Sequence, residues 1–162
     1  MTRLILALLT ILTASAVQAA TDDCAAPAKT PLLAEGCAVL DRFIETFNAR
    51  DPKAWAETLN FPHVRLAGGE VQVWATPEDY AKSNDVAQFA KTGWRYTKWD
   101  WRHLAQSGDD KLHFVLQFTR YGDNDRKIAS FESLYILTKQ GGHWGVQARS
   151  SYAGITAPGN AY

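Results

Sequence analysis

Two residues with useful chemistry, His63 and Arg65, alternate with Val64 and Leu66 in a short stretch that has the period of a β-strand. This alternation places both polar side chains on one face of the strand. A histidine titrates near neutral pH, and an arginine is a fixed cation whose shape matches a carboxylate. If that face lines a cavity, the pair can bind a carboxylate or orient a polar ligand. If it faces outward, the pair is ordinary solvated surface.

Two carboxylates are further candidates for acid/base chemistry. Asp100 lies between Trp99 and Trp101, and burial beside indoles raises the pKa of a carboxyl group toward the range useful in catalysis. Glu132 shares its strand parity with apolar residues, and a carboxylate in such surroundings needs a partner. The alternatives are a hydrogen-bonded structural acid at Asp100 and a cross-strand ion pair of Glu132 on an exposed or dimer face. An acid/base enzyme would combine these two residues with His63.

The aromatic content favours a small-molecule pocket. The 162 residues include six tryptophans, and pockets are typically aromatic-walled with a few convergent polar groups. Tryptophans that only fill a large core are the alternative. The expected ligand-binding residues are Arg65, Trp74, Trp94, Trp99, His113, Arg120, Tyr135 and Arg149. The sequence has no phosphate-binding loop, dinucleotide fingerprint, nucleophile elbow or metal-spaced cluster, so it predicts neither a cofactor nor a metal.

The first residues have the pattern of a secretory signal peptide over residues 1–19. Arg3 precedes the largely apolar run Leu4–Leu12, and small residues flank a cleavage position after Ala19. The run is too short to span a bilayer, so a periplasmic or secreted protein without membrane attachment is expected. Cys24 and Cys37 would then meet an oxidising compartment, which favours a disulfide, with two unpaired thiols as the alternative. The chain has 17 basic and 17 acidic residues, and this balance gives nucleic acid no cationic surface.

Periodicity divides the remaining chain into elements. After an irregular leader (20–32), an apolar stripe at helical spacing comprises Leu33, Cys37, Leu40, Ile44 and Phe47. A short helix begins at an Asp51 cap, and a third runs from Pro77 to about Lys91 with a break at 83–85. Strands at 62–66 and 70–74 form a small hairpin across Gly68-Gly69. Four long strands at 94–105, 111–121, 127–139 and 144–152 form an antiparallel meander before a loose tail (153–162).

This order of elements resembles the nuclear transport factor 2-like superfamily over residues 33–152. The segments Phe47–Asp51 and Gly142–Val146 are similar to its polyketide-cyclase (SnoaL-like) branch. The resemblance implies one α+β domain, a cone-shaped barrel in which three N-terminal helices and a small hairpin pack on a curved four-stranded antiparallel sheet. It also implies a ligand or active site at the mouth of the cone and a homodimer through the outer face of the sheet.

The catalytic residues of these relatives do not carry over. The steroid isomerases of the superfamily have an aspartate base on the small hairpin, where this chain reads Leu66-Ala67-Gly68-Gly69 and offers Glu70 as the one substitute. The cyclases often have a histidine or aspartate late in the last strand, where Arg149-Ser150-Ser151 stands here. We therefore expect an exported small-molecule-binding domain of unknown ligand. The alternatives are an acid/base enzyme (isomerase, dehydratase or cyclase) acting on a small, partly apolar substrate, and a protein-binding role through the outer sheet face.

Overall fold

A computed structural model describes residues 21–154, so the predicted signal peptide and most of the predicted tail lie outside the described residues. The helices are α1 (Pro31–Asn48), α2 (Pro52–Ala56), α3 (Pro77–Ser83) and α4 (Val86–Ala90), with a short 3₁₀ helix η1 (Asp123–Asp125). The strands are β1 (Leu59–Ala67), β2 (Glu70–Trp74), β3 (Tyr96–Ser107), β4 (Lys111–Tyr121), β5 (Lys127–Gln140) and β6 (His143–Ser151). None of the described helices is long and apolar enough to cross a membrane.

Side-chain caps explain where the helices begin. The Asp51 carboxylate accepts hydrogen bonds from the first-turn amides of α2, which confirms the predicted cap. The expected third helix is wrong as one element, because the chain forms two helices there. Asn84 leaves helical geometry and its amide bonds back to the Tyr80 carbonyl, while Asp85 caps α4 anew. The break predicted at 83–85 is thereby confirmed.

The six strands form one sheet in the order β2-β1-β6-β5-β4-β3. The meander β3 to β6 is confirmed, as is the hairpin turn at Gly68 and Gly69, both of which have positive φ. The expectation of a four-stranded sheet beside a separate hairpin is wrong, because β1 pairs in parallel with β6 and carries β2 into the same sheet. The expected barrel is also wrong: the sheet is open, with β2 and β3 at its two edges.

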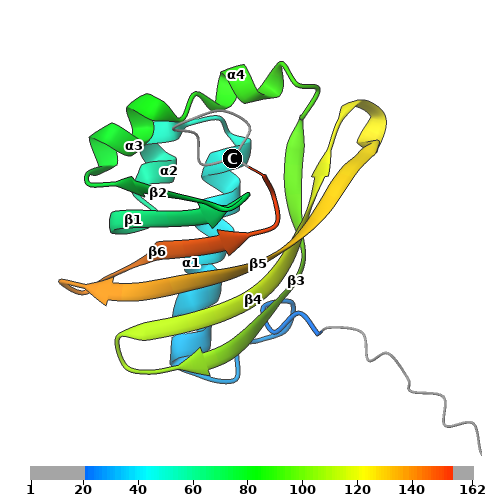
Figure 1. Ribbon diagram of the computed structural model, residues 1–162. Helices are drawn as coiled ribbons and strands as arrows, with labels where there is room; N and C mark the ends of the chain where they lie inside the picture. The colour runs from blue at the N-terminus through cyan, green and yellow to red at the C-terminus, as the bar shows by residue number, and fades with distance from the viewer. Residues whose placement is uncertain (1–20, 155–162) are drawn as a thin grey trace, which may run out of the picture.

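The sheet curves around α1. The smaller helices α2 and α3 lie toward the end of the sheet where β1 and β2 are found, and α4 lies between α3 and the start of β3 (Figure 1). The core lies between α1 and the concave face of the sheet. It is built from the alternate residues of each strand that point inward, such as Leu112, Phe114 and Leu116 of β4, which are fully buried. A bulge between Trp99 and Trp101 shifts this alternation in β3.

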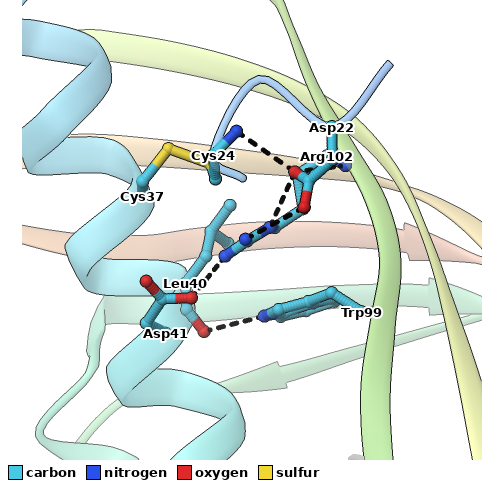
Figure 2. A network of polar contacts seen from close by, with 7 residues as sticks. All are labelled: Asp22, Cys24, Cys37, Leu40, Asp41, Trp99 and Arg102. Carbon is cyan, nitrogen blue, oxygen red and sulfur yellow. Dashed lines mark hydrogen bonds and ion pairs between the residues drawn. A yellow bond between two sulfur atoms is a disulfide. The ribbon is translucent and has the colours of Figure 1, made fainter. Parts of the chain in front are cut away.

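The segment before α1 is fastened to the edge strand β3. Asp23 donates its backbone N–H to the Arg102 carbonyl (2.8 Å), and Asp22 accepts from the Arg102 amide. The predicted disulfide is present between Cys24 and Cys37, whose Cα atoms are 5.6 Å apart. Figure 2 shows this bridge beside the buried Arg102 guanidinium, which lies between the Asp22 and Asp41 carboxylates. The leader therefore links α1 to the end of the sheet that would otherwise be an open edge.

Candidate functional site

A cavity lies between α1 and the inner face of the sheet, walled by aromatic rings from both layers. Its lining residues are Phe43, Ile44, Phe47, Trp55, Arg65, Thr97, Trp99, Phe118, Arg120, Tyr135, Arg149, Ser151 and Ala153. The cavity has a volume of about 30 Å³. One buried water needs on the order of 10–15 Å³, so the cavity has room for a small polar head group and not for a polycyclic body.

Three arginines from three different strands point into this cavity. The register of the sheet explains their meeting: Arg65 of β1 is the direct neighbour of Arg149 of β6, and Arg149 is in turn the neighbour of Tyr135 on β5. Arg120 enters from β4, at the other end of the cavity wall. Their exposed fractions are 2% for Arg65, 9% for Arg120 and 6% for Arg149. Arginine is almost never buried to this degree without a partner.

Two of the three guanidinium groups, those of Arg120 and Arg149, meet no carboxylate among the described residues. Within residues 21–154, no ion pair involves Arg120 or Arg149, and no acidic side chain lines the cavity. Arg65 donates a hydrogen bond to the Ala153 carbonyl oxygen at 2.7 Å. Like charges on neighbouring strands repel each other. Arg120 and Arg149 therefore give the cavity wall a positive charge that no described acidic side chain on the wall balances.

Burial and mutual repulsion change the pKa values of the three arginines. Burial, with Arg149 as the next cause, lowers the pKa of Arg65 to about 10. Burial likewise lowers the pKa of Arg120 to about 10. Burial also acts to lower the pKa of Arg149, but the Tyr80 and Tyr135 hydroxyls outweigh it and the net direction is upward. All three groups remain cations at neutral pH, and burial is the first cause of the lowered pKa at Arg65 and Arg120.

Two buried donors on the cavity wall have no acceptor. Across the described part of the chain, the buried side-chain nitrogens or oxygens without a hydrogen-bond partner are Trp55 Nε1 and Arg120 Nε. Both belong to residues that line the cavity. The Arg120 guanidinium lies over aromatic rings instead, 4.8 Å from the Phe89 centroid and 5.1 Å from that of Phe131. A buried donor left unsatisfied costs free energy, so an acceptor inside the cavity would stabilise both groups.

His63 is fully buried and lies behind Arg149 without lining the cavity. Its Nδ1 is 2.9 Å from the Val146 carbonyl oxygen, and its Nε2 receives the Arg149 Nε–H at 3.2 Å. Burial, followed by the charge of Arg149, lowers the pKa of His63 well below its usual 6.5. The imidazole is therefore neutral at pH 7 and is reached by no ligand in the cavity.

The other two predicted acid/base residues lie on the opposite face of the sheet. Asp100 and Glu132 are both exposed. Asp100 accepts a hydrogen bond from Thr119 Oγ1 at 2.6 Å, and Glu132 is paired in register with Gln117. Of the three predicted catalytic residues, the structure thus brings none into the cavity.

The predicted ligand-binding residues divide into two groups. Arg65, Trp99, Arg120, Tyr135 and Arg149 line the cavity. The other three, Trp74, Trp94 and His113, do not. Trp74 is buried and donates to Ser83 Oγ, Trp94 is buried and donates to Thr97 Oγ1, and His113 lies on the outer face opposite Ile136.

Sequence reasoning missed Phe43, Trp55 and Tyr80 as parts of the site. Phe43 and Trp55 line the cavity, and the Tyr80 hydroxyl accepts from Arg149 Nη2 at 3.2 Å. A readable signal existed in the strands: Arg120 shares the parity of Leu116 and Phe118, and a cation at a core position is unusual. Residues 21–154 contain no group of three or more His, Cys, Asp or Glu side chains that could hold a metal ion.

Comparison with known proteins gives a family and a fold. The family model described as NTF2-like protein (DUF6841) matches residues 35–153. None of the curated proteins matches the chain in sequence. The structure is similar to a cystatin-like-fold protein of unknown function from Nostoc punctiforme, with a TM-score of 0.63 and 15% identity over 80% of this chain and 96% of that one.

Two further solved structures have similar folds. A putative calcium/calmodulin dependent protein kinase II association domain from Xanthomonas campestris has a TM-score of 0.62 and 20% identity, covering 87% of this chain and 100% of that chain. A putative ketosteroid isomerase from Shewanella frigidimarina has a TM-score of 0.58 and 16% identity, covering 72% of this chain and 94% of that chain. At these identities the likeness concerns the fold alone.

Proposed function

The chain belongs to the NTF2-like protein family DUF6841, and on that premise we propose that it is an exported module that binds a small, partly apolar anion, with a carboxylate as the head group. One observation carries the proposal: two buried cations, Arg120 and Arg149, face an aromatic cavity in which the described chain provides no acidic side chain. An anion would balance their charge, and its head group, which is the part that the cavity has room for, would contact the surrounding rings.

The unsatisfied donors support the same ligand class. A carboxylate has two oxygens that accept several hydrogen bonds. Trp55 Nε1 and Arg120 Nε are two buried donors on the wall of one cavity that find no acceptor among residues 21–154. A neutral hydrocarbon would leave both unsatisfied, and a cation would meet the repulsion of the arginines.

Binding without turnover is favoured over the acid/base alternative. General acid/base catalysis needs a titratable group within hydrogen-bond reach of the substrate. The three residues that were candidates for this work lie behind Arg149 (His63) or on the outer face (Asp100 and Glu132). The ketosteroid isomerase likeness contributes a fold and no matching base.

The test is a matched set of ligands that differ in charge. Benzoate and phenylacetate are compared with benzamide and phenylacetamide by calorimetry and thermal shift, since ligand binding to the native state raises the unfolding temperature. Each carboxylate should bind about 10-fold or more tightly than its amide, the value of one charge-assisted hydrogen bond. Arg120→Gln should abolish this preference, whereas Arg95→Gln, which removes an exposed arginine, should keep it. The ligands should be recovered unchanged.

Three results would contradict this proposal. Equal binding of amide and carboxylate would make the ligand neutral, and conversion of a bound ligand would revive the enzyme alternative. Binding that is unaffected by Arg120→Gln would move the site elsewhere on the protein.

Export is part of the same proposal. The Cys24–Cys37 bridge is of a kind that persists in oxidising compartments. Protein recovered from the periplasm and then denatured should show no free thiol on titration. Two thiols per chain would contradict export in this folded form.

We also propose that the outer face of the sheet pairs with a second copy of the chain. A row of neighbouring residues crosses this face from β2 to β4 through Val71, Leu66, Ser150, Leu134 and Val115. Val71 is 64% exposed and Leu66 is 45% exposed, and exposed apolar rows of this kind mark contact surfaces. Sedimentation should give a dimer for the wild type and a monomer for Val115→Asp; a monomeric wild type would exclude the pairing.

A further inference from the structure

The hydrogen bonds around His63 fix the state of its ring. The Val146 carbonyl can only accept, so the Nδ1 atom 2.9 Å away must donate to it. A guanidinium can only donate, so the Nε2 atom 3.2 Å from Arg149 Nε must accept. The neutral tautomer with its proton on Nδ1 meets both requirements, and the imidazolium does not, since it has no acceptor to offer Arg149.

Arg149 is held at a second point by α3. Its Nη2 donates to the Tyr80 hydroxyl at 3.2 Å. Its guanidinium carbon is 5.3 Å from the Phe43 ring centroid and 5.7 Å from that of Trp55. With Nε and Nη2 both engaged and rings beside it, the guanidinium has one orientation before any ligand arrives.

We propose that His63 is a positioning residue for ligand binding: by accepting the Arg149 Nε–H, it holds the guanidinium in the orientation that meets the anion. The inference rests on the proposed function. A long arginine side chain has many rotamers, and ordering them on binding weakens affinity. A guanidinium that is already ordered avoids that loss. His63 acts through Arg149 and touches no ligand.

The groups around His63 keep its Nε2 atom unprotonated and therefore available as an acceptor. The charged or titratable groups that face His63 are Arg149 on β6, Arg65 on its own strand and Tyr80 on α3. None of them favours a positive imidazole, and burial is the first cause of its lowered pKa. The ring therefore stays neutral at the pH at which most exposed histidines begin to charge.

The test compares an acceptor with an apolar replacement. His63→Gln places an amide oxygen near the position of Nε2, whereas His63→Leu removes the acceptor at similar volume. By calorimetry with benzoate at pH 7.5, His63→Leu should lose about 10-fold or more in affinity, and His63→Gln should stay within about threefold of the wild type. Tyr80→Phe, which keeps the ring and removes the hydroxyl that accepts from Arg149 Nη2, should give an intermediate loss of affinity. A role in packing alone would weaken Gln and Leu alike.

A measurement on the ligand-free wild type tests the inference even if the variants do not fold. Nitrogen-15 NMR of the wild-type imidazole at pH 6 should show a neutral ring protonated at Nδ1 with an unprotonated, hydrogen-bonded Nε2. A ring protonated at Nε2 would overturn the positioning role whatever the variants do.

The outcomes separate this inference from the proposed function. Unchanged benzoate affinity in His63→Leu, or equal losses in Leu and Gln, overturns the positioning role and leaves anion binding intact. A wild-type protein that binds none of the carboxylates overturns both.

Discussion

Two buried arginines on the inner face of the same sheet have opposite surroundings. Arg102 on β3 is 6% exposed and lies between two carboxylates, those of Asp22 and Asp41 (Figure 2). Arg120 on the neighbouring strand β4 is 9% exposed and lies among the rings of phenylalanines, with its Nε–H unsatisfied. The charge and the loss of hydration are similar, but the compensation is not.

This difference separates a structural cation from a functional one. Removing a guanidinium from water costs several kcal/mol unless charges and acceptors replace the water. At Arg102 the leader and α1 supply them, so the network serves to join the N-terminal segment, α1 and β3. At Arg120 the described chain supplies no carboxylate, and under the proposed function a bound anion would supply the compensation.

The largest expected effect is the loss of the balanced arginine. Arg102→Met leaves the carboxylates of Asp22 and Asp41 without their cation. The Asp22 side chain is 20% exposed and that of Asp41 is 53% exposed. Because one of the two carboxylates is half hydrated, we expect a loss of about 3 kcal/mol, the lower end for breaking a buried pair. Urea unfolding measures it. The exposed pair Arg95–Asp123 is the control, and Arg95→Met should cost less than about 1 kcal/mol. Equal losses in both variants would erase the distinction.

The unbalanced arginine should give a smaller effect of opposite sign. Arg120→Met replaces an uncompensated charge with an apolar chain that suits the ring cage of Phe89, Phe118 and Phe131. The ligand-free protein should gain about 1–2 kcal/mol in stability, because packed apolar groups need no compensation for lost hydration whereas buried ions do. Urea unfolding without ligand gives the sign. A destabilised variant would mean that Arg120 is structural after all.

Local sequence patterns predicted much of the fold. The alternation in Lys111–Tyr121 predicted β4 with both its ends, and the Asp51-Pro52 pair predicted the start of α2. These features depend on neighbours in sequence. The parallel pairing of β1 with β6 joins segments more than 80 residues apart, and no local pattern specifies it. That pairing is what places Arg65 beside Arg149.

The site was harder to predict because alternation gives two faces without saying which is covered. In β5, apolar residues occupy both faces: Leu134 and Ile136 point outward, and Tyr135 and Leu137 point inward. Glu132 therefore had apolar neighbours of its own parity and still lies in solvent. At Asp100 the bulge between Trp99 and Trp101 breaks the parity argument itself. The arginines at inward positions indicated the site better, because a buried cation is rarely explained by packing alone.

The smallest effect should come from an acidic residue on the outer face. Glu132→Gln removes a charge that is exposed and separated from the cavity by the sheet, so neither the cavity arginines nor the Arg102 network should respond. Stability should change by less than about 0.5 kcal/mol, and benzoate affinity by less than about twofold, since exposed charges are screened by water and salt. Calorimetric titration of Glu132→Gln with benzoate, run in parallel with Arg120→Met, tests this prediction. A tenfold change in affinity would show that the potential in the cavity is set by the whole sheet and not by the arginines that line it, and the contrast between Arg102 and Arg120 would then lose its local explanation.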